Sequence, residues 1–356
     1  MDNQKRGDAM SKKSKKVRVK LIANPGSGTI AGRGQLLEQV TLCLKEHGVK
    51  VDVAVAKPHA AALPIARRAV KAGYKVIIAM GGDDTVEAII RGMAGSKARL
   101  GIIPAGTAND LAKSLGIPED PLEACALIAD GHFRKLDLGQ VRVGNGKKMP
   151  FFELVTVGIG AAVYEDALHA SKGRLSSLMG AIQTVLAHET KPKITLVLDD
   201  DSNVTVDTML AVVSNVPLIG PNMLVAPDAV LDDGLFDISV YPDFSKTEAL
   251  AYFTRVANEG HADDGTNQRY RARKIKIKAS PKLEVLADGI LLGKGTVRIK
   301  VLPGALRVIA PEAGSGAEKP PQTTDADLPA PVAPAVTNKA LDKNGSQPRP
   351  ELSAKN

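Results

Sequence analysis

Apolar and polar positions follow two different rhythms along the chain, and the change of rhythm falls near residue 140. Before that point, short apolar runs typical of buried strands alternate with stretches that place apolar residues at helical spacing. This order predicts a parallel sheet with helices on both faces. Strands are predicted at 17–25, 51–56, 75–80 and 99–106, and helices at 34–47, 60–72, 85–93, 109–115 and 121–129.

After residue 140, strand-like runs separated by turn residues dominate, and helical stretches interrupt them near 171–189 and 245–258. The pattern predicts a largely antiparallel β domain. In the basic run 269–278, Ile275 and Ile277 alternate with lysines, which predicts one buried and one solvated strand face. We favour a solvated face over a nucleic-acid patch for these lysines.

Both ends of the chain have the composition of disordered tails. Residues 1–20 carry eight basic residues against Asp2 and Asp8, a net charge of +6 out of +8 for the whole chain. Such a run is most often a solvated arm, and a reversible tether to anionic lipid is the functional alternative. The predicted domains are a basic tail (1–16), an α/β domain (17–140), a β domain (141–311) and a Pro/Ala-rich tail (312–356).

Composition bears on the cellular compartment and on the classes of partner that the protein can have. Cys43 and Cys125 fall on apolar positions of predicted helices, which predicts two reduced thiols in the core. No apolar run reaches 18 residues, and no signal-peptide-like segment follows the N-terminal charges. Aromatic residues make up only 3% of the chain, which argues against a base-stacking nucleic-acid platform. We expect a cytoplasmic protein, at most peripheral to a membrane, with no nucleic-acid partner.

Three glycine-rich segments follow predicted strands, at the carboxyl ends where parallel sheets bind ligands. Glycine lets backbone N–H groups approach a phosphate closely, and an acid such as Asp83 can bind Mg²⁺ or position a hydroxyl. For Asn109 or Asp110 taken singly, a helix cap is the simpler interpretation. The segments are ANPGSGT (23–29), which is not a Walker A loop, GGDDT (81–85) and PAGTAND (104–110).

Taken together, these segments resemble the diacylglycerol kinase catalytic domain, and most closely the bacterial YegS/BmrU-type lipid kinases. The resemblance covers about residues 17–311. It implies a Rossmann-like nucleotide domain followed by a β-sandwich-like lipid domain, whose last strand returns toward the first domain. The matching residues are Asn24-Pro25 with Ser27-Gly28, Gly81-Gly82-Asp83 with Thr85, GTAND (106–110) followed by LGIP, APDAVLDDGLFDI (226–238), ADG (287–289) and VLPGALRVIAP (301–311).

The resemblance implies transfer of the γ-phosphate of ATP, bound with Mg²⁺, to a hydroxyl of diacylglycerol, ceramide or a related lipid at the membrane surface. A homodimer is left open. A structural metal is implied at the backbone carbonyls of Val230 and Leu235 and the side chain of Asp233, where it would staple the second domain. Contacts to nucleotide and phosphate are implied for Asn24, Gly81, Gly82, Asp83, Thr85, Gly106, Thr107 and Asn109.

Two positions depart from the family pattern. Asp84 stands where the family has glycine; its spacing to Glu87 predicts a capping box for the following helix, and an extra Mg²⁺ ligand is the alternative. Ile290 stands where the family motif Asp-Gly-Glu has the glutamate usually given the general-base role. Asp83 or Asp288 could replace that base, so these two are the catalytic candidates.

Other functional classes stay open beside the lipid kinase. Ile290 favours a catalytically impaired relative that binds nucleotide or lipid. A nicotinamide-nucleotide kinase shares the Gly-Gly-Asp loop, but the NPGSG and GTAND segments and the β domain make it less favoured. A nucleic-acid-binding function rests on charge alone.

Overall fold

The computed structural model describes residues 18–24, 33–158, 192–219, 223–241, 248 and 267–312. All of them belong to one compact unit that ends at Pro320. Both predicted tails lie outside the described residues, apart from Glu312. So do Pro25, Ser27 and Gly28 of the first glycine-rich segment, and almost all of the predicted helical stretches near 171–189 and 245–258.

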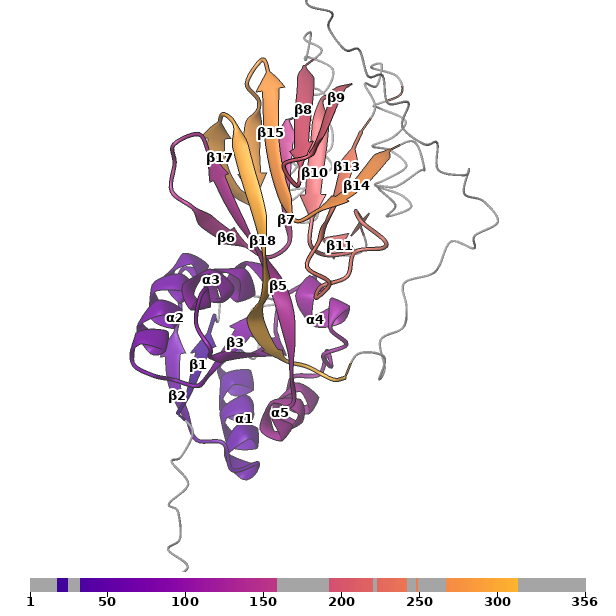
Figure 1. Ribbon diagram of the computed structural model, residues 1–356. Coiled ribbons are helices and arrows are strands. Elements are labelled where there is room, and N and C mark those ends of the chain that lie inside the picture. Colours follow the sequence, from indigo (N-terminus) through magenta and orange to yellow (C-terminus); the bar gives the residue numbers. More distant parts are fainter. Residues whose placement is uncertain are drawn as a thin grey trace, which may run out of the picture. The chain divides into compact units, whose positions relative to one another are not determined.

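The first part of the chain alternates strands and helices, as the sequence predicts (Figure 1). Four strands pair in parallel in the order β2-β1-β3-β4, so their carboxyl ends lie along one edge of the sheet. The elements are β1 (Val19–Ala23), α1 (Arg33–Glu46), β2 (Val51–Val55), the 3-10 turn η1 (His59–Ala61), α2 (Ala62–Lys71), β3 (Val76–Gly81), α3 (Asp83–Met93), β4 (Arg99–Pro104), α4 (Asp110–Ser114) and α5 (Pro121–Asp130).

The second part is β-rich and mostly antiparallel. One six-stranded sheet has the order β14-β13-β10-β7-β16-β17. The strands are β5 (Phe133–Val143), β6 (Met149–Phe151), β7 (Leu154–Gly158), β8 (Lys193–Leu198), β9 (Ser202–Asp207), β10 (Leu210–Ser214), β11 (Leu218–Ile219), β12 (Met223–Leu224), β13 (Phe236–Val240), β14 (Gln268–Ala272), β15 (Lys274–Ser280), β16 (Glu284–Ala287), β17 (Ile290–Lys294) and β18 (Val297–Ile309).

Strand β18 joins the two parts into one ten-stranded sheet. Its first half pairs antiparallel with β15, and its carboxyl end pairs in parallel with β4, where Arg307 lies beside Arg99. Strand β5 follows β18 along nearly its whole length, with one irregularity between Leu302 and Leu306. The last strand therefore returns to the parallel sheet, as the family resemblance implies.

The structure has two apolar cores. One includes the parallel sheet and the helices that pack on it, and the other lies between the two sheets of the β-rich part. In the second core, the rings of Phe151 and Phe236 stack with centroids 5.5 Å apart. Ile275 and Ile277 point into it, while Lys274 and Lys278 are exposed, so the predicted alternation along β15 is confirmed. No helix among the described residues has the length and apolar character needed to span a bilayer.

The buried carboxylate of Asp137 fixes the irregularity in β18. It accepts hydrogen bonds from the backbone N–H groups of Gly234 (2.6 Å) and Gly304 (2.7 Å). Both glycines have positive φ angles, 76° and 58°, which favour residues without a Cβ atom. Asp137 thus ties β5 to the turn before β13 and to the bend in β18.

We expect Asp137→Ala to lower the free energy of unfolding by about 3 kcal/mol, because two partly buried N–H donors lose a charged acceptor. Urea denaturation followed by circular dichroism measures the change. Asp201→Ala, at the exposed turn between β8 and β9, is the matched control and should leave stability unchanged. Equal stability of the two variants would contradict the role given to Asp137.

Helices α1 and α5 bring the two cysteines together. Cys125 is fully buried, and burial, with Cys43 as a second cause, raises the pKa of its thiol to about 12. Cys43 is only half-buried. The prediction of two free thiols is confirmed, but only Cys125 is a core residue.

We expect one thiol per folded chain to react with a disulfide reagent at pH 8, because a thiol with so high a pKa forms almost no thiolate. The absorbance of the released chromophore measures the count. Cys43→Ser should abolish the reaction in the folded protein, and urea should expose Cys125 in that variant. Fast labelling of Cys125 in the folded chain would contradict its burial.

Candidate active site

The loops after β3 and β4 touch each other at the carboxyl edge of the parallel sheet. A Cβ atom on Gly106 would lie 2.4 Å from the Cα atom of Gly82, which no real contact permits. Backbone meets backbone here, so Gly106 is required by close approach rather than by a special φ angle. A Cβ on Gly81 would likewise come within 2.8 Å of the Thr85 side chain.

Asp83 links the two loops through its carboxylate. Its two oxygens accept hydrogen bonds from the backbone N–H groups of Asn109 (2.9 Å) and Asp110 (2.7 Å), at the start of α4. Burial raises the pKa of Asp83, and these amide hydrogen bonds act in the opposite direction. Asp83 therefore organises the site, whether or not it also contacts a ligand.

Asn109 shapes the second loop. Its backbone is left-handed, with φ of 55°, and its side chain bonds to both the N–H (2.9 Å) and the carbonyl (3.2 Å) of Gly106. Asn tolerates this conformation better than most residues. Thr107 lies exposed at the tip of the loop that Asn109 closes.

Asn24 joins the end of β1 to α3. Its Nδ2 atom donates a hydrogen bond of 2.9 Å to Oγ1 of the fully buried Thr85. The structure therefore brings together seven of the residues that the resemblance assigns to nucleotide and phosphate. They are Asn24, Gly81, Gly82, Asp83, Thr85, Gly106 and Asn109.

The capping box predicted for Asp84 and Glu87 is wrong. The helix begins two residues earlier than predicted, so Gly82 is the N-cap and Asp84 lies exposed within the first turn. Glu87 is buried and pairs with Arg91 (3.3 Å) one turn further along the helix. A first-turn carboxylate still interacts favourably with the helix dipole, which is a sufficient role for Asp84.

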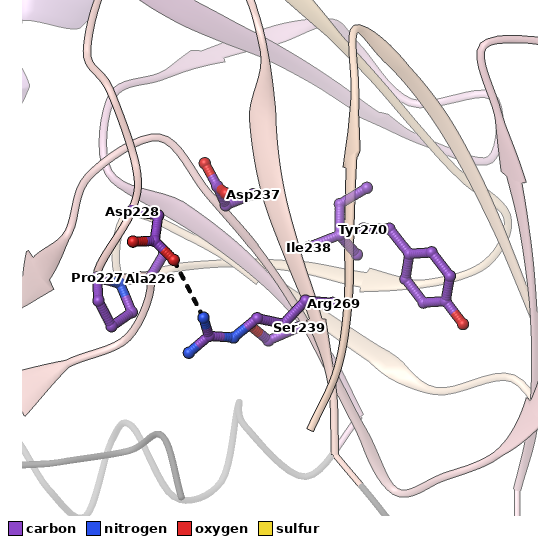
Figure 2. Close-up of a pocket in the computed structure, with 8 residues that line it drawn as sticks. All are labelled: Ala226, Pro227, Asp228, Asp237, Ile238, Ser239, Arg269 and Tyr270. Atoms are coloured by element: carbon purple, nitrogen blue, oxygen red, sulfur yellow. Dashed lines mark hydrogen bonds and ion pairs between the residues drawn. The ribbon is translucent and has the colours of Figure 1, made fainter. Parts of the chain in front are cut away.

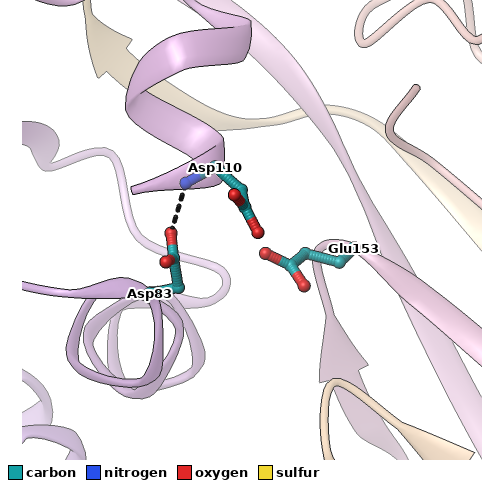
Figure 3. A group of neighbouring side chains, drawn as sticks. All are labelled: Asp83, Asp110 and Glu153. Atoms are coloured by element: carbon teal, nitrogen blue, oxygen red, sulfur yellow. Dashed lines mark hydrogen bonds between the residues drawn. The ribbon is translucent and has the colours of Figure 1, made fainter. Parts of the chain in front are cut away.

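Glu153, which the sequence analysis did not single out, belongs to the site. Figure 3 shows its carboxylate directed toward those of Asp83 and Asp110, and one oxygen from each lies within 4.8 Å of the others. Only 7% of Glu153 is exposed. Burial raises its pKa well above the ordinary value, and the surrounding carboxylates raise it further. No motif marks Glu153, because it comes from the bend between β6 and β7, distant in sequence from the glycine-rich loops.

Asp288 holds the backbone of this segment in place. Its carboxylate accepts hydrogen bonds from the N–H groups of Phe152 (2.7 Å), Glu153 (2.9 Å) and Leu154 (3.2 Å), and it lies 3.9 Å from the Arg91 guanidinium. Burial raises the pKa of Asp288, against the effect of these partners. Asp288 accepts three backbone amides and is almost fully buried, so the geometry gives it a positioning role. Ile290, 37% exposed on the following strand, brings no ionisable group.

Asp233, one of the residues predicted to bind a structural metal, is already paired with a positively charged side chain. The Asp233 carboxylate forms an ion pair with Arg271, which also lies 3.3 Å from Asp237, and it accepts a hydrogen bond from the N–H of Leu235 (2.9 Å). A metal bound by Val230, Asp233 and Leu235 would compete with Arg271 for Asp233. The donor set is thus less suited to a cation than the acidic cluster.

A small pocket lies elsewhere, along strands β13 and β14. Figure 2 shows Asp228 and Arg269 joined by an ion pair (3.2 Å) at this pocket, near Tyr270. None of its lining residues belongs to the acidic cluster. The pocket therefore has no part in the chemistry of the cluster.

The site's arrangement suits phosphate chemistry. The N-terminus of α3 is a favourable place for an anion, and three carboxylates offer hard oxygen ligands to a divalent cation.

Comparison with known proteins agrees with this geometry. Residues 18–141 match the family model of the diacylglycerol kinase catalytic domain, and residues 153–310 match the YegS C-terminal NAD kinase beta sandwich-like domain. A structure of a diacylglycerol kinase from Bacillus anthracis shares the fold, with a TM-score of 0.64 and 23% identity, covering 85% of this chain and 99% of that one.

Two relatives match along most of their length. A diacylglycerol kinase of Mycobacterium tuberculosis is 29% identical over 83% of this chain and 96% of its own. A YegS-like lipid kinase of Pseudomonas aeruginosa is 30% identical over 78% of this chain and 90% of its own. With both domains matched in order, the chain belongs to the diacylglycerol kinase family, in its YegS-like lipid kinase branch.

Proposed function

We propose that the protein transfers the γ-phosphate of ATP to a hydroxyl of diacylglycerol or a related lipid, with Mg²⁺ as cofactor. The observation that carries the proposal is the junction of the Gly81-Gly82 and Gly106 loops, closed by the Asp83 carboxylate, at the ligand-binding edge of the sheet. The match to the diacylglycerol kinase catalytic domain supports a lipid kinase over the nicotinamide-nucleotide kinase that shares the Gly-Gly-Asp loop.

Within this function, the loop backbones and the α3 N-terminus hold the phosphates, and Asn24 and Thr85 fix the end of β1 against α3. Asp83 and Asp110 would hold the cation. Bound there, Mg²⁺ would neutralise charge on the transferring phosphoryl group. The lipid would be reached peripherally, at the membrane surface.

A second candidate, a nucleotide- or lipid-binding protein without turnover, has one observation in its favour. Ile290 has no proton-accepting group, and both oxygens of Asp288 are occupied by backbone amides. A general base contributes typically about 10²–10⁴-fold to a rate, so its absence weakens a kinase without necessarily abolishing transfer.

We expect the wild-type protein to transfer phosphate from labelled ATP to at least one lipid in mixed micelles containing diacylglycerol, ceramide or monoacylglycerol. Asp83→Asn should lower the rate about 100-fold or more, because one loop amide loses its charged acceptor and the phosphate site is displaced. Thin-layer separation of the labelled lipids measures the rate.

The exposed Glu38→Gln on α1 makes the same charge change and should keep wild-type activity. If the wild type is inert and Ile290→Glu gains activity, the second candidate replaces the first. If neither the wild type nor Ile290→Glu transfers phosphate to any lipid, the kinase proposal is wrong.

We expect Gly106→Ala to weaken ATP binding about 100-fold, because the added Cβ would force the two loops apart and displace the phosphate-binding amides. Calorimetric titration with ATP and Mg²⁺ measures the affinity. Gly34→Ala, where a Cβ would meet nothing within 4 Å, is the matched control and should bind as the wild type does. Unchanged affinity in Gly106→Ala would place the nucleotide elsewhere.

A further inference from the structure

The Glu153 side chain is buried without a partner. Its carboxylate accepts no hydrogen bond and forms no ion pair with any residue that the structure describes, although 93% of the residue is shielded from water. An isolated buried carboxylate is costly, and proteins usually pair it or use it as a metal ligand. Its surroundings are acidic: Asp83 and Asp110 face it (Figure 3), and Glu87 and Asp288 lie nearby.

Hydrogen bonds hold the backbone around Glu153 in place, so the point from which its unpartnered side chain projects is well defined. The Glu153 N–H donates to Asp288 (2.9 Å), and its carbonyl accepts from the N–H of Asn215 (2.8 Å). The Asn215 side chain also donates to the carbonyl of Phe152 (2.9 Å). These contacts fix the backbone from which the Glu153 side chain projects, and the side chain is directed into the cluster.

We infer that Glu153 is the third carboxylate ligand, with Asp83 and Asp110, of a divalent cation. Two ligand oxygens of one Mg²⁺ lie at most about 4.2 Å apart, and those of one Ca²⁺ at most about 5 Å. The separation of up to 4.8 Å between these oxygens therefore needs only a small closure to bind Mg²⁺.

The site would connect the two parts of the chain. Asp83 and Asp110 belong to the nucleotide-binding part, whereas Glu153 immediately precedes β7 of the β-rich part. The same Asp288 that holds Glu153 lies two residues before Ile290, where the family pattern has a glutamate.

The role of this cation in phosphoryl transfer rests on the kinase function proposed above, but its binding does not. The test therefore uses the full chain without nucleotide or lipid. Electron paramagnetic resonance of free Mn²⁺ gives the dissociation constant, and the shift of the melting temperature by Mg²⁺ gives a second readout.

We expect Glu153→Gln to bind Mn²⁺ at least about tenfold more weakly than the wild type and to lose the stabilisation by Mg²⁺. Without metal, the variant should melt at or above the wild-type temperature, because a neutral amide replaces a buried carboxyl group whose ionised form is costly. Glu153→Asp, which keeps the charge on a shorter side chain, should bind with intermediate affinity.

Two further variants give the controls. Glu38→Gln removes an exposed carboxylate and should leave both readouts unchanged. Asp233→Asn should also keep Mn²⁺ binding, since Arg271 already neutralises Asp233. Wild-type affinity in Glu153→Gln, loss of binding in Asp233→Asn instead, or no Mn²⁺ binding by the wild type would each overturn the inference. The lipid assay decides the kinase function independently of all three outcomes.

Discussion

The contact between Asp288 and the backbone of residues 152–154 is the constraint on which the site depends. Three amide hydrogen bonds to one buried carboxylate are strong, because the acceptor is charged and water is excluded. The positive charge nearest to that carboxylate comes from Arg91 on α3, which also pairs with Glu87. A turn of the β-rich part is thereby fixed against a helix of the α/β part, and the Glu153 carboxylate lies near that of Asp83 as a consequence.

The glycine contacts impose the complementary constraint. Gly82 and Gly106 allow two loops to approach more closely than any residue with a Cβ would permit. The Asp83 carboxylate then accepts hydrogen bonds from the backbone N–H groups of Asn109 and Asp110. The N-terminus of α3 and three carboxylates converge there, an arrangement suited to an anion and a cation together. That combination is what a metal–nucleotide complex requires.

Much of the fold could be predicted from the sequence, because strand and helix periodicities are local properties. The alternation up to residue 130 and the inward placement of Ile275 and Ile277 follow from them directly. The helix start at Asp83 was misplaced because Gly82 serves as N-cap through its extended backbone, so no side chain marks it. Motif residues such as Asp83 and Asn109 could be found because glycine-rich turns repeat in sequence. Glu153 could not, since its place in the site depends on long-range contacts to Asp288 and Asn215.

The presence of Ile290, which cannot act as a base, matters less for the proposed function if Glu153 belongs to the site. Phosphoryl transfer depends mainly on positioning and on neutralising charge, and a base adds a smaller factor. If the chain is the lipid kinase proposed above, Glu153 beside Asp288 would contribute to charge neutralisation, although Ile290 supplies no base. On this argument, the loss at position 290 should slow turnover more than it weakens binding of the metal–nucleotide complex. In the kinase proposed above, the acidic cluster would then matter more than any single base.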